Sequence, residues 1–309
     1  METTERGRTT ELFEKLGGIV ADGFPAIHSP VSRTGTGTAY LKAPGVVMLS
    51  KPQVNVQSLG GFLKGFDPEL EFPGYIDDPT ELPGSSQLCK TAGQLCYASF
   101  GPRRTTNDNA AAYFERLTSA GHGSVLEHAS FSFLLYGISR SVTHELVRHR
   151  AGVGISQVSQ RYVSGSVLRF VERPEYQDGG ELHRLFENRV DRAAAEYEEM
   201  AGRLLERQER GDALLDAEYR TDARKKVQQT ARALLPNETE APMVFTGNVR
   251  ALRHIIEMRA DEHAESEIRT LAVRLFLCLV RGDPILFSDY QLQSLPDGTQ
   301  KVTTKYRKA

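Results

Sequence analysis

Residues 148–162 constrain this chain more than any other stretch, because they combine cations, glycines and hydroxyls in an order that a solvated surface does not need. In order, the run holds Arg148, His149, Arg150, a glycine-containing segment at 151–155, Ser156, Gln157, Val158, Ser159, Gln160, Arg161 and Tyr162. Planar guanidinium groups bind phosphate oxygens bidentately, and hydroxyls and loop N–H groups supply further donors. The run therefore predicts a phosphate-binding site.

A purely structural explanation accounts for part of this run. Residues 139–150 predict a helix with apolar positions at Val142 and Leu146. Cations in the last turn of a helix are favoured by the helix dipole, by about 0.3–1 kcal/mol each. That explanation covers Arg148 and Arg150, but it does not cover the serines and the Arg-Tyr pair that follow at once. Composition alone leaves both interpretations open.

The same residues resemble the signature of flavin-dependent thymidylate synthases, which is Arg-His-Arg, a short spacer and then Ser/Asn-x-x-Ser-x-Arg-Tyr. Ser156, Ser159, Arg161 and Tyr162 occupy its second half. The spacer departs from the usual pattern, because residues 151–155 are five where four are usual and the usual Ser is absent. The departure concerns the flavin contacts expected of this loop.

Two further blocks resemble the same family and occur in the expected order. Residues 121–128 read Gly-His-x-Ser-x-x-Glu-His. The C-terminal half carries Ala-Arg-x-x-Leu-Pro at 231–236, Asn-x-Arg at 248–250 and Arg-Ala-Asp-x-His-Ala at 259–264. The resemblance covers about residues 88–290 and is specific, because separated blocks agree.

Two histidine-containing segments could suggest a metal site, and their spacing argues against both. His122 and His128 lie six residues apart across a predicted turn, which fixes no common face. The pair His144-Glu145 lacks the second histidine that zinc proteases place three residues after the Glu, because Arg148 stands there. We therefore predict no bound metal.

Bulk properties exclude several classes of protein. The net charge of −2 gives no basic field that would attract nucleic acid or anionic lipid. No apolar run approaches the roughly 18 residues of a membrane span, and the N-terminus lacks the apolar core of a signal peptide. Three cysteines are too few for a disulfide framework, so we expect a reduced, cytoplasmic protein without nucleic-acid or membrane partners.

The patterning and the resemblance together predict how the chain is divided. We expect a partly irregular N-terminal extension at 1–44, a catalytic domain at 45–295 and a C-terminal tail at 296–309. Within the extension, residues 9–16 predict a short helix and residues 29–38 a loop.

Periodicity and capping signals predict the elements of the catalytic domain. The predicted helices span residues 88–98, 107–120 (capped by Asn107 or Asp108), 139–150, 180–211, 221–235 and 261–281, with another that follows a cap at Asn248. The predicted strands span residues 45–49, 129–135, 168–171 and 243–246.

The resemblance implies an α/β fold in which a central mixed sheet is flanked by long helices, the flavin-dependent thymidylate synthase fold. It implies a homotetramer with flavin sites between subunits. The implied reaction makes dTMP from dUMP, with methylenetetrahydrofolate as carbon donor, reduced FAD as hydride donor and NADPH as reductant of the flavin. The family needs no cysteine nucleophile.

The resemblance also implies residue roles. For FAD it implies His122, Ser124, Arg148, His149, Arg150, Gln157, Asn248, Val249, Arg250 and His254, with Ser124 acting from a neighbouring subunit. For dUMP it implies Glu145, Arg148, Gln157, Val158, Ser159, Gln160, Arg161, Arg232 and Arg259. Arg259 is the predicted catalytic residue, because a guanidinium beside the uracil ring stabilises the negative charge that makes C5 nucleophilic.

Two alternatives remain open at this stage. One is a flavin-dependent enzyme of the same fold that hydroxymethylates dUMP, which product mass would distinguish. The other is a non-enzymatic nucleotide-binding or RNA-binding protein that uses the same arginines. The near-neutral net charge counts against the second.

Overall fold

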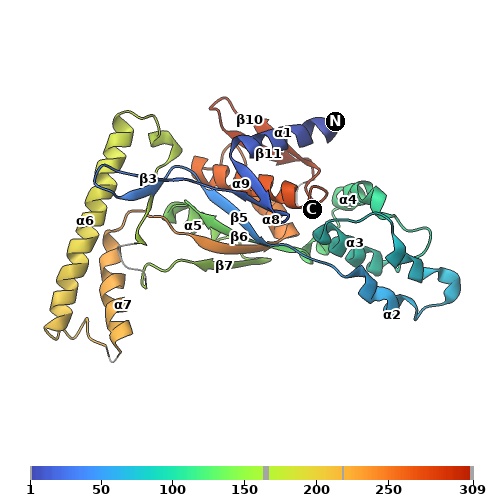
Figure 1. Ribbon diagram of the computed structural model, residues 1–309, viewed down its shortest axis with the longest axis horizontal. Coiled ribbons are helices and arrows are strands. Elements are labelled where there is room, and N and C mark those ends of the chain that lie inside the picture. Colours follow the sequence, from blue (N-terminus) through green and yellow to red (C-terminus); the bar gives the residue numbers. More distant parts are fainter. Residues whose placement is uncertain (1, 163–166, 218, 307–309) are drawn as a thin grey trace.

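The computed structural model describes residues 2–162, 167–217 and 219–306, and a six-stranded sheet forms its centre (Figure 1). The strand order is β1-β2-β5-β6-β9-β7, and every neighbouring pair is antiparallel. The strands are β1 (Gly18–Ala21), β2 (Phe24–Ile27), β5 (Gly45–Ser50), β6 (Ser130–Tyr136), β9 (Met243–Asn248) and β7 (Val153–Gln157). The predicted α/β composition is confirmed, whereas the prediction of a mixed central sheet is wrong.

Among the described helices, α8 (Val249–Arg259) and α9 (Ser266–Gly282) cover one face of this sheet, and an antiparallel sheet can leave its other face uncovered. On β6, Phe131, Phe133 and Leu135 are fully buried, while the residues between them are partly exposed. The buried face packs against α8 and α9 in one hydrophobic core. A parallel or mixed sheet between two helical layers would bury both faces, and this sheet does not.

Helical units extend from the two ends of the sheet (Figure 1). One end holds α6 (Glu181–Glu209) and α7 (Arg220–Ala231). Beside α6 lies a three-stranded sheet of β3 (Val31–Arg33), β4 (Ala39–Leu41) and β8 (Phe170–Val171), in which β4 and β8 form the one parallel pair of described strands. The other end holds α2 (Gly60–Leu63), α3 (Gly84–Cys96) and α4 (Ala110–Ser119).

The remaining elements complete the chain. They are α1 (Glu2–Lys15), α5 (Arg140–Leu146), β10 (Tyr290–Ser294) and β11 (Gln300–Thr304). Short 3-10 helices lie at Val56–Leu59, Pro68–Leu70, Phe72–Asp77, Asn107–Asn109, Gly123–Glu127, Pro174–Tyr176 and Arg232–Leu234. None of the described helices is long and apolar enough to span a membrane.

The first 44 residues contain more regular structure than the sequence suggested. The predicted short helix exists, but it is the longer α1. The segment predicted as a loop at 29–38 contains β3, which pairs with β4 through a turn at Thr34–Thr38. Strands β1 and β2 join the central sheet, because β2 pairs with β5. The division of the chain into an extension, a catalytic domain and a tail stays a prediction.

Two predicted helix boundaries were wrong for identifiable reasons. The helix predicted from residue 261 starts at Ser266, because the carboxylate of Glu265 accepts hydrogen bonds from the N–H groups of Glu267 and Ile268. The helix predicted to residue 150 ends at Leu146, so the Arg-His-Arg motif lies in the turn beyond it.

The predicted cap at Asn107 or Asp108 is also wrong. Helix α4 starts after Asn109, and the Asn107 side chain donates instead to the carbonyl oxygen of Thr80 and to Gln87 Oε1. These partners are remote in sequence, so no local pattern reveals them.

Two segments predicted without regular structure form strands. The spacer at 151–155 enters β7, whose residues pair with β9 at the edge of the central sheet. The predicted tail contains β11, which pairs with β10. Both pairings are set by a partner strand and not by the segment itself.

Candidate active site

Three residues that the resemblance assigned to dUMP or to FAD meet at the end of α8. Arg259 is the last residue of this helix, and its Nε donates to Nε2 of His149 at 3.0 Å. Its Nη1 donates to Oε2 of Glu145 at 2.5 Å, and its Nη2 donates to the Glu145 carbonyl oxygen at 3.4 Å. We call Glu145, His149 and Arg259 the Arg259 cluster. It brings a predicted catalytic residue, a predicted flavin contact and a predicted substrate contact together.

The electrostatics of the cluster fix the protonation of His149. Burial, the Arg259 charge and His254 lower the pKa of His149 to about 4. The ring of His254 lies edge-on, with its centroid 5.7 Å from that of His149. A guanidinium group has no acceptor, so His149 Nε2 must accept from Arg259 and the ring proton resides on Nδ1. His149 is therefore neutral near pH 7 and offers a donor through Nδ1.

The other end of α8 is fixed by the loop that follows the Arg-His-Arg motif. Asn248 caps the helix, as predicted, because its Oδ1 accepts from the N–H of Ala251 at 2.9 Å. The Asn248 N–H donates to the Gly152 carbonyl oxygen at 2.9 Å. Gly152 has φ +69°, and a Cβ there would lie 2.5 Å from the Asn248 side chain. A glycine is thus required where this loop meets the helix.

Helix α5, which carries Glu145, is anchored at its start by a buried carboxylate. Ser139 caps the helix by accepting from the N–H of Val142 at 3.3 Å. Both the N–H and the hydroxyl of Ser139 donate to Glu267 at 2.8 Å. Burial raises the pKa of Glu267 to about 7. Because Glu267 belongs to α9, this contact fixes α5 against the covering helices.

The turn after α5 presents cations that remain unpaired. Its backbone is held by hydrogen bonds from the N–H of Arg148 to Glu145 and from the N–H of His149 to Leu146. The side chains of Arg148 and Arg150 are exposed and make no ion pair with any described residue. Gly152, two residues after Arg150, touches the cap of α8, so the end of this turn meets a helix N-terminus. A helix N-terminus that follows an exposed cation suits a phosphate group.

The sequence block at residues 121–128 is joined to α8 through Arg250. Its Nη1 donates to Glu127 Oε1 at 2.5 Å. Glu127 ends the 3-10 turn that holds Ser124, and the predicted flavin contacts His122 and Ser124 are both exposed there. Val249 differs from them, because its side chain is fully buried in the core and only its backbone could contact a ligand.

The residues predicted for the substrate phosphate form a second group beyond β7. Ser159 Oγ accepts from the Arg161 N–H at 3.3 Å. Tyr162 is exposed and lies between two cations, with Arg161 at 5.8 Å and Lys225 at 5.0 Å from its ring centroid. Gln160 Nε2 is buried and has no partner among the described residues. Gln157 ends β7, and Val158 follows it with its N–H bonded to Pro242.

Arg232 was predicted inside a helix at 221–235, but α7 ends at Ala231 and Arg232 begins the 3-10 turn that follows it. The structure adds a second arginine whose pKa the Arg232 charge affects. Burial and the Arg232 charge lower the pKa of Arg140. Both guanidinium groups are half-buried, and neither has an acidic partner in the described part of the chain. Two like charges without an acidic partner attract anions to this part of the molecule.

Comparison with known proteins identifies the family. The family described as "Thymidylate synthase complementing protein" matches residues 79–285. The chain belongs to this family. Among curated proteins, the "Flavin-dependent thymidylate synthase" of Mycolicibacterium gilvum (strain PYR-GCK) is 43% identical over 239 residues, 76% of this chain and 92% of that protein. The protein of the same name from Mycobacterium avium (strain 104) is 42% identical over 228 residues, 73% and 87% of the two chains.

Within the family match, sequence reasoning missed Arg140. A signal was present, because a cation in the first turn of a helix opposes the helix dipole. Arg140 is the first residue of α5. Such a residue is favoured only if an anion or an acidic partner offsets the repulsion.

The metal-binding and nucleophilic side chains of this member of the family are scattered. No group of three or more His, Cys, Asp and Glu residues in the described chain could hold a metal ion. All three cysteines are free. Burial raises the pKa of Cys89 and of Cys278 to about 12. A thiol with such a pKa is a poor nucleophile near pH 7.

Proposed function

We propose that this chain is a flavin-dependent thymidylate synthase that converts dUMP to dTMP, with methylenetetrahydrofolate as carbon donor and NADPH as reductant. The family and the names of its relatives support the flavin-dependent reaction. The observation that carries the proposal is the Arg259 cluster, since it joins a permanent cation to a neutral histidine where two sequence blocks meet.

FAD supplies a hydride when it is bound and reduced, and this chain has the groups to hold its phosphates. We assign that role to Arg148, Arg150 and the segment at 248–250, with His122 and Ser124 as further contacts. Two observations support this assignment. Arg148 and Arg150 are exposed without an ion-pair partner among the described residues, and the end of their turn meets the N-terminus of α8 at Gly152.

The dUMP phosphate is assigned to Ser159, Arg161 and Arg232, and we add Arg140. A phosphate dianion would offset the repulsion between the two half-buried arginines. The free amide of Gln160 is a further donor in the same segment. This group recognises a charge that is the same before and after the reaction, so it contributes binding and not catalysis.

Arg259 is assigned to the chemical step. Its guanidinium cannot lose its proton at working pH, so it acts as a fixed positive charge beside the uracil ring and not as a proton shuttle. Glu145 and His149 orient it from two sides before dUMP arrives. A preorganised charge of this kind stabilises negative charge on the uracil ring, which is the charge that makes C5 nucleophilic toward the one-carbon unit.

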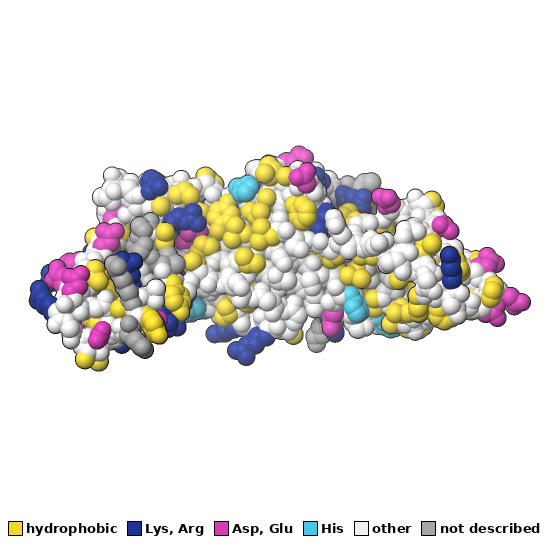
Figure 2. Space-filling view, turned by 60° about the horizontal axis from the view of Figure 1, so that its bottom comes forward, with side chains coloured by type: hydrophobic (Ala, Val, Ile, Leu, Met, Phe, Trp, Pro, Cys, Tyr) yellow, Lys and Arg dark blue, Asp and Glu magenta, His cyan; other side chains and the backbone are white. Residues whose placement is uncertain are grey.

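We propose a homotetramer, and the uncovered face of the central sheet supports it. On that face Val47, Leu134 and Val244 stand opposite one another on three adjacent strands. Val244 is 39% exposed, and Figure 2 shows hydrophobic side chains gathered over the middle of the molecule. An apolar sheet face of this kind suits contact with a second copy of the chain.

A complementation experiment tests whether the flavin site is shared between chains. Ser124→Ala and Arg148→Ala are each expected to lower activity. Mixed oligomers that are reassembled from the two variants should regain part of it, because some sites then contain two intact halves. A fully active monomer in solution would contradict the proposal.

The most informative experiment is the visible spectrum of the purified protein with and without dUMP. We expect retained flavin absorbance after reconstitution and desalting, and a change in the flavin bands when dUMP is added. Mass spectrometry of the product should then show thymidylate and not the hydroxymethyl analogue. If calorimetry detects no FAD binding, the proposal fails.

A further inference from the structure

The C-terminal hairpin of β10 and β11 holds the helix that carries Arg259. The sequence predicted only a tail at 296–309, and the family match ends at residue 285. Yet β11 contacts both α8 and α9, and Figure 1 shows the hairpin packed beside these helices. Hairpin residues and α8 are therefore parts of one packed unit.

The first set of contacts lies at the C-terminal end of α8. The Val302 N–H donates to the carbonyl oxygen of Ala260 at 3.0 Å, and Ala260 follows Arg259 directly. Val302 is almost fully buried. One residue earlier on the same strand, Lys301 Nζ bonds Glu262 Oε2 at 2.8 Å. The backbone that emerges from Arg259 is thus fixed by the hairpin.

The second set of contacts lies within α8, at Arg253, six residues before Arg259. This side chain is 2% exposed, and its two terminal nitrogens donate to the two oxygens of Asp289 at 2.7 and 2.8 Å. The Tyr290 hydroxyl donates to the Arg253 carbonyl oxygen at 3.0 Å, and the Thr304 hydroxyl donates to Asp289 at 2.5 Å. Both hairpin strands therefore take part in the anchor.

We propose that the hairpin is a positioning element, which fixes the end of α8 and thereby holds the Arg259 guanidinium against His149 and Glu145. The effect on turnover rests on the proposed function, whereas the effect on geometry does not. A displacement of about 1 Å at a reacting centre is enough to lower a rate by on the order of a hundredfold. A hydrogen bond to the residue next to Arg259 can control a displacement of that size.

The hairpin offers a matched pair of substitutions. Leu292 and Val302 stand opposite each other, and both have N–H groups that point away from the ladder. The Val302 N–H donates to Ala260, whereas the Leu292 N–H donates to the Glu5 side chain. Proline at either position removes an N–H that the ladder does not use and replaces a buried side chain, so the two substitutions are matched in both respects. Val302→Pro is the test and Leu292→Pro is its control.

The primary measurement is the titration of His149, followed by NMR in histidine-labelled protein without cofactor. The charge of Arg259 helps to hold the pKa of His149 at about 4. If Val302→Pro moves Arg259 away, that pKa rises toward its ordinary 6.5, and Leu292→Pro leaves it unchanged. Simple destabilisation would not change the titration of the folded protein. An unchanged titration in folded Val302→Pro overturns the proposal.

The second measurement is turnover per bound FAD. We expect Val302→Pro to lose tenfold or more, with the KM for dUMP within about twofold, whereas Leu292→Pro stays within about twofold of the parent protein. Equal losses in the two variants contradict the proposal. A parent protein that makes no dTMP contradicts the proposed function instead, and the His149 titration still decides the positioning role.

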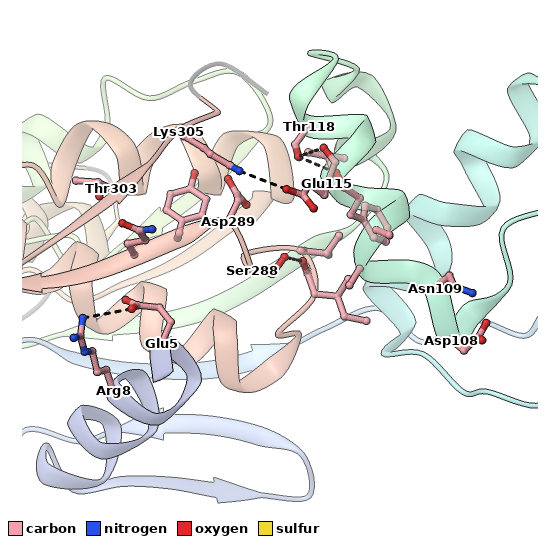
Figure 3. Close-up of a pocket in the computed structure, with 18 residues that line it drawn as sticks. Glu5, Arg8, Asp108, Asn109, Glu115, Thr118, Ser288, Asp289, Thr303 and Lys305 are labelled. Carbon is pink, nitrogen blue, oxygen red and sulfur yellow. Dashed lines mark hydrogen bonds and ion pairs between the residues drawn. The ribbon is translucent and has the colours of Figure 1, made fainter. Parts of the chain in front are cut away.

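A second, milder pair of substitutions tests the proposal if the proline variant does not fold. Lys301→Met removes the ion pair with Glu262, beside the end of α8. Lys305→Met removes the ion pair with Glu115, which lines a cavity of about 780 Å³ beyond the C-terminal end of β11 (Figure 3). Only Lys301→Met should raise the pKa of His149. If neither or both raise it, the hairpin does not position Arg259.

Discussion

Arg259 and Arg232 both lie at the ends of helical segments in the C-terminal half, and their surroundings differ. Arg259 is fully engaged within the chain, by Glu145 on one side and His149 on the other. Arg232 has no acidic partner among the described residues, and its neighbour Arg140 carries the same charge. Arg259 is held in place by contacts within the chain, whereas Arg232 and Arg140 have no acidic partner among the described residues.

This difference corresponds to two different functions of a positive charge, which are stabilising a transition state and binding a phosphate. A charge that stabilises a transition state must be preorganised, because any rearrangement adds to the barrier. A charge that binds a phosphate can remain unpaired until the phosphate arrives, because the ion pair itself supplies the binding energy. The contrast between the two arginines can therefore be tested by comparing kcat with KM.

The largest expected effect is that of Arg259→Ala on turnover. Loss of a preorganised charge should lower kcat by on the order of 10²–10³, while FAD is retained and the KM for dUMP changes little. Steady-state kinetics measure kcat and KM, and the absorbance of the purified variant measures the retained FAD. Arg259→Lys is the matched control, because it keeps the charge and loses the contacts to Glu145 and His149. If Arg259→Ala changes only KM, its assigned role is wrong.

Arg232→Ala and Arg140→Ala should instead act on dUMP affinity. A hydrogen bond to a charged group is worth about 1.5–3 kcal/mol, so KM should rise by on the order of 10–100-fold while kcat stays within about threefold. Deoxyuridine, which lacks the phosphate, provides the control, because its weak use should be unchanged by either substitution. A large loss of kcat in Arg140→Ala would show that this arginine is not a phosphate ligand.

Gly152→Ala should weaken the junction between the Arg-His-Arg turn and α8. The positive φ and the close approach to Asn248 make a side chain unfavourable there, at a cost of about 1–3 kcal/mol. Chemical denaturation measures the loss in the free energy of unfolding, and FAD titration should show weaker binding. Gly154→Ala is the control, because its Cβ would lie 3.8 Å from Thr246, an ordinary contact. Equal losses of stability in Gly152→Ala and Gly154→Ala would contradict the requirement for a glycine at the junction.

Acidification should break the Arg259 cluster through His149. The pKa of His149 is lowered to about 4 from 6.5, so the folded state resists protonation that the unfolded state accepts. The stability of the cluster is complete above pH 6.5 and is lost as the pH falls toward 4. The Tm difference between the parent protein and His149→Gln should therefore shrink by roughly 2–4 °C over that range. A constant difference would show that His149 is not held neutral.

The smallest expected effect is that of replacing the cysteines. A triple variant with Ala at Cys89, Cys96 and Cys278 should keep turnover within about tenfold, because no thiol is needed as a nucleophile. The variant tests whether the Arg259 cluster alone organises the chemical step. A loss of several decades of activity in the folded triple variant would falsify that mechanism.

The sequence determined the elements whose signals are local. The cap at Asn248, the periodicity of α6 and the alternation of β6 each arise within a few residues, and each was predicted close to its observed place. The sequence blocks also predicted the family, because their residue types and spacing match its signature. They led to the prediction that Arg259, His149 and Glu145 are site residues, but they predicted no contact among them.

Only the tertiary structure decided which of these residues meet. Arg259 and His149 are 110 residues apart, and their contact depends on strand pairing that has no local pattern. The antiparallel order of the sheet, the strand β7 inside the predicted spacer and the hairpin against α8 all depend on partners remote in sequence. Arg140 near Arg232 is the same kind of result. Helix periodicity and caps are short-range effects, whereas strand register and the proximity of charges are set by how the whole chain packs.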